Sequence, residues 1–336
     1  MTLDPILVTG AAGFAGSHLL DLLEADAGRV VAWRRPGERL PQPPTGTRCR
    51  WMAVELLDAR AVREAVETIR PSRVYHLAGA AQVGGSWQLA SQALEVNVLG
   101  TQILLDAVAA AVPAAVVLVS GSALVYREHD RAISEDHPLG PGSPYAMSKL
   151  AQEMAAVEAA ADLGLRVAVT RSFPHIGPRQ APSFFTASVA RQIARIEHGL
   201  AAPVLDVGNL ESRRDFTDVR DTVRAYHTIL ERAPAGAVYN VCSGTARRMG
   251  DILESLLQEA RTRIEVRRDP SRLRPHDESL VLGDRSRLTG ELGWEPRIPM
   301  SQTLGDLLDY WRHVVASGAE ERPDAVRRPA SWASGA

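Results

Sequence analysis

Two kinds of hydrophobic pattern alternate along the first half of the chain. Ile6-Leu7-Val8-Thr9 is an apolar run typical of a strand buried on both faces, and residues 17–24 follow with helical spacing. The alternation continues, with strand patterns at 29–33, 48–54, 74–77 and 115–120 and helical patterns at 59–68, 94–110 and 143–162. Strands separated by helical lengths imply right-handed crossovers. The sequence therefore predicts an α/β fold on a doubly wound parallel sheet, with ligand at the carboxyl ends of its strands.

A glycine-rich loop, Gly10-Ala11-Ala12-Gly13-Phe14-Ala15-Gly16, joins the first strand to its helix. Gly10 permits a tight turn, Gly13 lets the backbone approach a pyrophosphate, and Gly16 lets the helix pack closely on the strand. Free N–H groups at the helix start face the anion. An ordinary turn is the alternative. The preceding strand and following helix favour a dinucleotide site that also uses Phe14 and Ala15.

The second strand ends in Arg34-Arg35, where an NAD-binding site usually carries an acidic residue for the ribose hydroxyls. Two guanidinium groups can instead bind a 2′-phosphate and stack on adenine. This pair therefore favours NADP(H) as the cofactor. The alternative is that both are ordinary solvated side chains in an Arg-rich protein.

Residues after the other strands should line the same crevice, because the carboxyl ends of parallel strands meet at one edge of the sheet. We expect further cofactor contacts from Glu55, Leu56, Leu77, Ala78, Ala80, Asn97, Ser120 and His175.

Composition singles out one cation, because Lys149 is the only lysine among 38 basic residues. A single Lys in a chain that otherwise uses Arg indicates that this position needs a compact ammonium group. Tyr145 lies four residues earlier, so a helix would present both side chains on one face. We expect the ammonium to lower the tyrosine pKa toward neutrality, which would make the phenol an acid or base. The alternatives are a chance survivor and an exposed surface pair.

Charge and hydropathy argue against several function classes. The formal net charge of −2 gives no electrostatic reason to expect nucleic acid or an anionic membrane as a partner. No apolar stretch is expected to approach the ~20 residues of a membrane span, and the N-terminus lacks the features of a signal peptide, so we expect a cytoplasmic protein. The only cysteines, Cys49 and Cys242, suggest neither a disulfide framework nor a metal site.

Three features of the chain together resemble the extended short-chain dehydrogenase/reductases that act on nucleotide sugars. They are TGAAGFAG at 9–16, Ser122 upstream of the tyrosine, and Tyr145-x-x-x-Lys149. The resemblance covers about residues 1–315. It implies a Rossmann domain, a smaller C-terminal α/β substrate domain and a catalytic Ser122, Tyr145 and Lys149. In that family the serine hydroxyl bonds the reacting sugar oxygen, with Ser120 as an alternative here. Lys149 would also bind the nicotinamide ribose.

The second half is similar to the branch that holds GDP-mannose dehydratases and GDP-4-keto-6-deoxymannose reductases. The segments are 208–221 (GNLESRRDFTDVRD), 239–244 (YNVCSG) and 272–277 (RLRPHD). Their arginines can clamp a diphosphate, and Asp277 can accept from ribose hydroxyls. The resemblance implies a nucleotide-diphosphate sugar, with GDP favoured, and substrate contacts from Ser86, Ser122, Pro174, Asn209, Arg213, Arg214, Arg274 and Asp277.

Two positions depart from this branch. The dehydratases carry Glu two residues after the catalytic Ser or Thr, where this chain has Leu124, and Leu cannot transfer a proton. Pro174 stands where the family pattern has Asn, which leaves the sugar orientation open. We therefore expect an NADPH-dependent reductase converting GDP-4-keto-6-deoxymannose to GDP-rhamnose. The alternatives are a nucleotide-sugar epimerase, a GDP-mannose 4,6-dehydratase and, least favoured, a non-catalytic NADP-binding regulator.

These placements divide the chain into two lobes and a tail. Residues 1–172 and 215–243 should form the nucleotide domain, residues 173–214 and 244–318 the substrate domain, and 319–336 a mobile end. The helices near 94–110 and 146–161 carry more apolar residues than one core-facing stripe needs. This excess predicts a homodimer through a four-helix interface.

Overall fold

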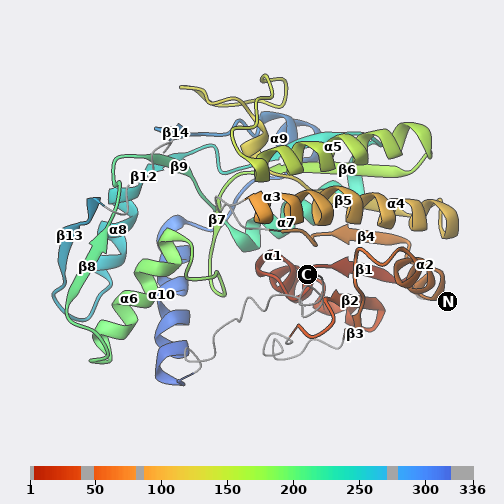
Figure 1. The fold of residues 1–336 in the computed structure, drawn as a ribbon. Helices are drawn as coiled ribbons and strands as arrows, with labels where there is room; N and C mark the ends of the chain where they lie inside the picture. Colours follow the sequence, from red (N-terminus) through yellow and green to blue (C-terminus); the bar gives the residue numbers. More distant parts are fainter. Residues whose placement is uncertain (1–3, 39–48, 81–86, 271–278, 319–336) are drawn as a thin grey trace, which may run out of the picture.

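The computed structural model describes residues 4–38, 49–80, 87–270 and 279–318. Two lobes are visible in Figure 1. A sheet covered by helices forms one lobe, and a smaller group of helices and short strands forms the other. The helical and strand patterns of the sequence correspond to these elements within a few residues at most boundaries.

A seven-stranded sheet is the centre of the larger lobe. Its order is β11-β6-β5-β4-β1-β2-β3, and every neighbouring pair is parallel. The strands are β1 (Ile6–Thr9), β2 (Val30–Arg34), β3 (Arg50–Ala53), β4 (Arg73–His76), β5 (Val116–Ser120), β6 (Arg166–Ser172) and β11 (Val238–Val241). The strand order reverses between β1 and β4, where such sheets bind ligands. The predicted doubly wound parallel sheet is confirmed.

Helices cover both faces of this sheet and enclose two apolar cores. One face carries α1 (Phe14–Leu22), α7 (Val219–Arg232) and α9 (Ser286–Leu292), and the other carries α2 (Ala59–Ile69), α4 (Gly100–Ala111) and α5 (Pro144–Asp162). Asp58 begins α2 by accepting hydrogen bonds from two backbone N–H groups, and Ser143 begins α5 in the same way with one. Short 3-10 turns lie at η1 (Glu24–Arg29) and η3 (Ala123–Val125).

The smaller lobe has its own core between α6 (Phe185–Glu197), α8 (Met249–Gln258) and α10 (Met300–Ala316). Its strands form three small sheets. They are β8 (Val204–Val207) with β13 (Glu265–Arg268), β7 (His175–Ile176) with β10 (Thr217–Asp218), and β9 (Arg213–Asp215) between β12 (Ala246–Arg248) and β14 (Leu280–Val281).

One helix departs from the expected division of the chain. Leu288 and Leu292 of α9, with Trp294 after it, lie in the core beneath α1 and α7 rather than in the smaller lobe. The segment 286–294 therefore packs on the nucleotide lobe, although the sequence pattern assigns 244–318 to the substrate lobe. The other boundaries of the two lobes stay a prediction.

A continuous helical run leads into α4. It consists of α3 (Trp87–Leu94), the π-helical turn η2 (Glu95–Leu99) and α4. Its part from Ala90 to Ala111 has a mean hydropathy of 1.4 over a membrane-length window, so the expectation that no stretch approaches that length is wrong. Length and composition are weak grounds for a span, because 44% of that window is buried inside the protein, as in the core helix of a soluble protein.

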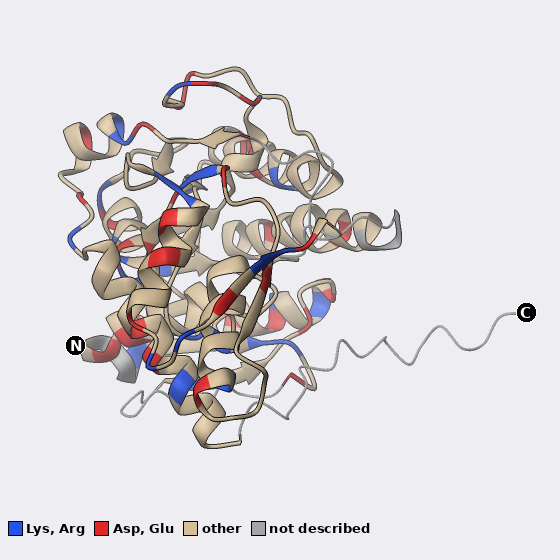
Figure 2. Cartoon of the chain, turned by 90° about the vertical axis from the view of Figure 1, so that its left-hand side faces the viewer, with Lys and Arg blue, Asp and Glu red and all other residues tan. Residues whose placement is uncertain are grey.

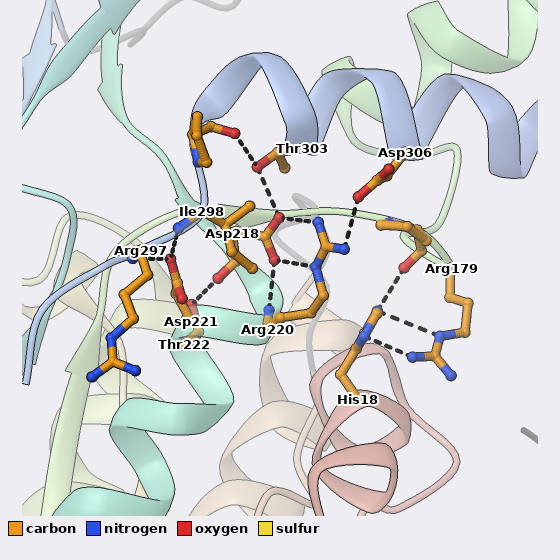
Figure 3. A network of polar contacts seen from close by, with 12 residues as sticks. His18, Arg179, Asp218, Arg220, Asp221, Thr222, Arg297, Ile298, Thr303 and Asp306 are labelled. Carbon is orange, nitrogen blue, oxygen red and sulfur yellow. Dashed lines mark hydrogen bonds and ion pairs between the residues drawn. The ribbon is translucent and has the colours of Figure 1, made fainter. Parts of the chain in front are cut away.

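Buried carboxylates at the start of α7 join the two lobes (Figure 3). Asp218 accepts from the guanidinium of Arg220 and from Thr303 Oγ1 of α10, at 2.7–2.9 Å. Asp221 accepts from the backbone N–H groups of Arg297 and Ile298. Because these buried charges have several donors each, they fix α10 against the larger lobe. Figure 2 shows basic and acidic residues interspersed along the described parts of the chain.

Candidate active site

The glycine loop has the geometry of a pyrophosphate cradle. Gly10 has a positive φ of 64°, and a Cβ there would lie 2.6 Å from Ala78 N. A Cβ at Gly16 would overlap the Gly10 carbonyl oxygen, so both positions require glycine. Gly13 is exposed and begins α1 without a side-chain acceptor for the helix N–H groups. These groups and the loop fit the diphosphate of a dinucleotide.

An aromatic stack ties this loop to the segment that follows β6. The rings of Phe14 and His175 lie 5.6 Å apart at an interplanar angle of 9°. One turn later, His18 Nε2 is 2.8 Å from the Pro178 carbonyl oxygen, and its other ring nitrogen contacts Arg179, as Figure 3 shows. Burial lowers the pKa of His18 to about 4, with Arg179 adding to the effect. Segment 175–179 is therefore held against the start of α1.

Arg34 and Arg35 lie at the carboxyl end of β2, beside the glycine loop. Arg34 Nη1 donates to the Glu38 carbonyl oxygen at 2.9 Å, and the Arg35 backbone N–H donates to Glu38 Oε2 at 2.9 Å. Arg35 itself is exposed. Both arginines are at the end of the sheet where a cofactor ribose would lie, and their role toward its phosphate stays a prediction.

Two side chains hold the loop after β4. Thr9 Oγ1 accepts from Ala78 N–H at 3.1 Å, and Asn97 Oδ1 accepts from Ala80 N–H at 2.9 Å. Asn97 is fully buried, and its amide nitrogen donates to Ser148 Oγ at 2.9 Å. Asn97 therefore links the loop after β4 to Ser148 of α5 through the two ends of its carboxamide. The sequence analysis predicted that it would contact the cofactor.

The remaining predicted cofactor residues differ in exposure. Glu55 is exposed, whereas Leu56 is buried against Gly100, whose added Cβ would lie 2.7 Å from Leu56 Cδ2. Leu77 is half-buried between β4 and the Ala78 loop. Leu56 is thus a packing residue as much as a candidate for contact with the cofactor.

Ser122, Tyr145 and Lys149 come together between β5 and α5. Ser122 begins η3, where its Oγ accepts from Leu124 N–H at 3.2 Å, and its side chain lies close enough to Tyr145 to act on the pKa of the phenol. Lys149 Nζ donates to the Ser120 carbonyl oxygen at 2.9 Å and to Gln152 Oε1 at 2.8 Å. Ser120 therefore uses its backbone to hold the lysine, and Ser122 is the serine that contacts the tyrosine.

The expected lowering of the Tyr145 pKa is wrong. Burial raises the pKa of Tyr145 to about 12, while the hydrogen bond from Ser122 acts in the opposite direction. Burial also lowers the pKa of Lys149 to about 8. The physical reason is that the ammonium is held by Ser120 and Gln152, and desolvation of the phenol prevails. Tyr145 is a protonated phenol at neutral pH.

A buried ion pair fixes both sides of this group. Arg171 of β6 donates from Nε and Nη2 to the carboxylate of Glu153 on α5, at 2.9 and 2.6 Å. Its Nη1 donates to the Tyr126 hydroxyl at 2.9 Å and to the Glu135 carbonyl oxygen at 2.8 Å. Tyr126 follows Ser122 by four residues and Glu153 follows Lys149 by four. Arg171 thereby links the serine loop to the catalytic helix.

The predicted diphosphate clamp stays a prediction, and the structure shows how two of its arginines lie. Arg213 and Arg214 are neighbours in β9, and side chains of consecutive strand residues point to opposite faces. Arg213 is exposed and lines an open pocket of about 700 Å³ with Glu211, Asp130 and the 244–246 turn, whereas Arg214 is half-buried. The two side chains leave β9 on opposite faces, and their contact with a diphosphate stays a prediction.

The other predicted substrate residues have mixed outcomes. Asn209 Oδ1 accepts from Glu211 N–H at 2.9 Å and shapes the turn before β9. The Pro174 carbonyl oxygen accepts from Thr217 N–H at 3.0 Å, beside the pairing of β7 with β10. Ser86, Arg274 and Asp277, together with the tail 319–336, lie outside the described residues.

Sequence reasoning missed several buried polar residues that position the site. Gln152, Thr101 and His76 form a hydrogen-bonded chain behind Lys149. Gln152 is three residues after Lys149 on the same helix, so its spacing was a usable signal. Thr101 and His76 come from other elements and give no local signal.

Comparisons with known proteins agree with this geometry. The family model described as GDP-mannose 4,6 dehydratase matches residues 7–307. The chain is 37% identical to GDP-6-deoxy-D-mannose reductase of Pseudomonas aeruginosa over 313 residues, which cover 92% of this chain and 98% of that protein.

Two solved structures are similar to this chain over most of its length. RMD of Pseudomonas aeruginosa, complexed with NADPH, superposes with a TM-score of 0.80 at 36% identity, covering 92% of this chain and 99% of that one. UDP-glucose 4-epimerase of Thermus thermophilus, complexed with NAD, gives a TM-score of 0.79 at 27% identity, covering 92% and 99%.

Proposed function

This chain belongs to the GDP-mannose 4,6-dehydratase family of extended short-chain dehydrogenase/reductases, and we propose that it reduces GDP-4-keto-6-deoxy-D-mannose to GDP-D-rhamnose with NADPH. The observation that carries the proposal is Leu124 at the position where dehydratases carry an acid, next to Ser122 and to a Tyr145 whose pKa burial raises to about 12. The similarity to the Pseudomonas aeruginosa reductase and to the NADPH complex supports the same activity and cofactor.

The polypeptide supplies binding, orientation and one proton. The glycine loop would hold NADPH, which would supply the hydride that reduces the 4-keto carbon. The Tyr145 hydroxyl gives its proton to the oxygen of that carbonyl, which becomes the new hydroxyl group. A pKa of about 12 suits this direction, because the phenol keeps its proton until a more basic alkoxide develops. Ser122 hydrogen-bonds the same oxygen and stabilises its developing charge.

Cofactor preference rests on the charges after β2. Arg34 and Arg35 are two cations at the end of the strand whose next residues would approach the adenosine ribose. A guanidinium can bind a 2′-phosphate through two parallel hydrogen bonds. We therefore assign the cofactor as NADP(H), held in addition by Gly10, Gly13, Gly16 and Lys149.

The dehydratase alternative lacks a proton carrier at the expected place. Loss of water across C5 and C6 requires a base and an acid besides Tyr145, and Leu124 can be neither. Two nearby acids could replace it. Glu128 is exposed, and Glu135 accepts from Asn240 N–H at 2.8 Å in the network around Arg171. Glu135 is therefore committed to holding β11 and is a poor substitute.

Incubation with two substrates separates the activities. The enzyme with GDP-4-keto-6-deoxymannose and NADPH should oxidise NADPH, and Tyr145→Phe should abolish that oxidation while still binding NADPH. The enzyme with GDP-mannose and NADP⁺ should form essentially no 4-keto-6-deoxy sugar. Steady formation of that sugar would identify a dehydratase, and stoichiometric NAD retained through purification would favour an epimerase.

We further propose that two copies of the chain form a homodimer, with activity in the cytoplasm. Five exposed apolar side chains lie on or directly after α3, η2 and α5: Leu94, Leu99, Met147, Met154 and Leu163, each 42–64% exposed. Figure 1 shows α3, α4 and α5 side by side. Two such helical surfaces can pair about a two-fold axis and bury these residues.

Sedimentation tests the dimer. Met154→Glu should shift the protein toward monomer, because Met154 is 64% exposed on α5 and would be buried in the pair. Val266→Glu is the matched control, since Val266 is an exposed apolar residue of β13 in the other lobe. A wild-type monomer at all concentrations would refute the proposal.

A further inference from the structure

A buried chain of polar side chains lies behind Lys149 and ends at the loop after β4. It begins with Gln152 and passes through Thr101 and His76 to Thr9, all with 0–1% of their surface exposed. The chain draws on α5, α4, β4 and β1. Because buried polar groups are costly without partners, such a chain is ordered only if every donor meets an acceptor.

We propose that Gln152 is a positioning residue for Lys149, and that Thr101 and His76 orient its carboxamide so that the oxygen faces the ammonium. The inference rests on the proposed function only in giving Lys149 its catalytic role. The number of protons that each group carries determines which group donates and which accepts in each hydrogen bond of the chain.

Thr101 determines which end of the Gln152 carboxamide faces it. The Thr101 hydroxyl has one proton, which it donates to the Asn97 carbonyl oxygen at 2.6 Å. Its oxygen can then only accept from Gln152 Nε2, at 2.8 Å. The nitrogen of the carboxamide therefore faces Thr101, and the oxygen faces Lys149 Nζ at 2.8 Å.

His76 completes the acceptor sites of Thr101. His76 Nε2 lies 2.9 Å from Thr101 Oγ1 and must donate there, because the threonine proton is already used. His76 Nδ1 is then the acceptor of the neutral ring, so Thr9 Oγ1 donates to it at 2.8 Å. Thr9 in turn accepts from Ala78 N–H. The pKa of His76 is lowered to about 3 by burial and by Lys149, so the ring stays neutral.

The consequence for Lys149 is an environment of neutral acceptors. Of its three N–H donors, two go to the Ser120 carbonyl oxygen and to Gln152 Oε1 within the described residues. Of the titratable side chains around it, His76 on β4 interacts with Lys149, Tyr145 lies four residues earlier on α5, and Glu95 of η2 and Asp106 of α4 are exposed. Glu153 is paired with Arg171. Gln152 therefore holds the ammonium in place without neutralising its charge.

This arrangement has a measurable consequence, because Lys149 is the only lysine in the chain. Protein made with ¹³C-labelled lysine, and carrying a lysine-free tag, gives one side-chain NMR signal that titrates with Lys149. In the wild type its pKa should lie near 8. Gln152→Glu places a carboxylate beside the ammonium and should raise that pKa by at least about one unit.

Two further variants keep the test informative if a buried Glu disturbs folding. Gln152→Met has similar volume but no acceptor, and it should lower the Lys149 pKa because the charged form loses a hydrogen bond. Thr101→Val removes the hydroxyl that orients the carboxamide and should move the pKa in the same direction by less. Gln258→Glu, at the exposed end of α8 in the other lobe, is the matched charge control and should leave the pKa unchanged.

The Lys149 pKa is measured without turnover, so a failure of the positioning role and a failure of the proposed reaction can be told apart. If the reductase assignment also holds, the alkaline limb of the pH profile of kcat/KM should move with the NMR pKa in Gln152→Glu. A Lys149 pKa within about 0.3 units of wild type in folded Gln152→Glu and Gln152→Met would overturn the positioning role of Gln152. An equal shift in Gln258→Glu would overturn it as well.

Discussion

Loss of the Arg171 guanidinium should destabilise the protein far more than loss of the guanidinium of an exposed arginine. In Arg171→Met, the Glu153 carboxylate loses both of its charged hydrogen bonds, and its side chain is only 6% exposed. The Glu135 carbonyl oxygen loses a donor as well. A buried charge left without its partner costs about 3–5 kcal/mol, so we expect the free energy of unfolding to fall by that amount.

Urea denaturation measures this loss, and a second substitution tests its cause. In Arg171→Met with Glu153→Leu the uncompensated charge is gone, so the double variant should be at least about 1.5 kcal/mol more stable than Arg171→Met alone. Arg60→Met is the matched control, because Arg60 pairs with Glu64 on the exposed surface of α2 and should change stability little. A loss below about 1 kcal/mol for Arg171→Met, or a double variant no more stable than the single one, would refute the reasoning.

Three further predictions concern cofactor, catalysis and pH. The enzyme should prefer NADPH to NADH, and the preference should shrink when Arg34 and Arg35 are both replaced by Ala; steady-state kinetics that favour NADH in the wild type would contradict this. Lys149→Arg should keep the charge yet lose most turnover, because a planar guanidinium cannot occupy the position of an ammonium held by Ser120 and Gln152; near-normal kcat would return Lys149 to a structural role. Burial lowers the pKa of His18 to about 4 and of His76 to about 3, below the unfolded value of 6.5. The unfolded chain therefore binds more protons between these values, and stability should fall as pH decreases below 6.5. Thermal unfolding should show a weaker fall in His18→Gln, and an unchanged slope would be inconsistent with this cause.

Local signals were enough to predict the parts of the site that lie within one turn or one helix. The glycine loop at 10–16 gives its strand, turn and helix in consecutive residues, and Tyr145 and Lys149 share a helix face by their spacing. The alternation of apolar runs likewise predicted β1 to β5, because a buried parallel strand needs no partner to be visible in sequence, whereas it assigned no strand to β6 or β11.

Features that depend on packing between distant segments were not predictable. The pKa of Tyr145 depends on burial by elements far along the chain, and the expected effect of Lys149 ignored that burial. Thr9 and His76 are 67 residues apart, and Gln152 and Thr101 are 51 apart, so no window of sequence contains their hydrogen bonds. The face of β9 to which Arg214 points depends on how β9 pairs with β12, and the sequence motif alone does not give that register.

Transfer of a labelled hydride tests the central claim most directly. The enzyme would be incubated with GDP-4-keto-6-deoxymannose and NADPH deuterated at the transferring position of the nicotinamide, and the sugar product analysed by NMR and mass spectrometry. The account predicts one deuterium at C4 of a GDP-linked 6-deoxyhexose, lost in Tyr145→Phe. A product without deuterium, or a sugar that remains a 4-ketone while NADPH is unchanged, would contradict it.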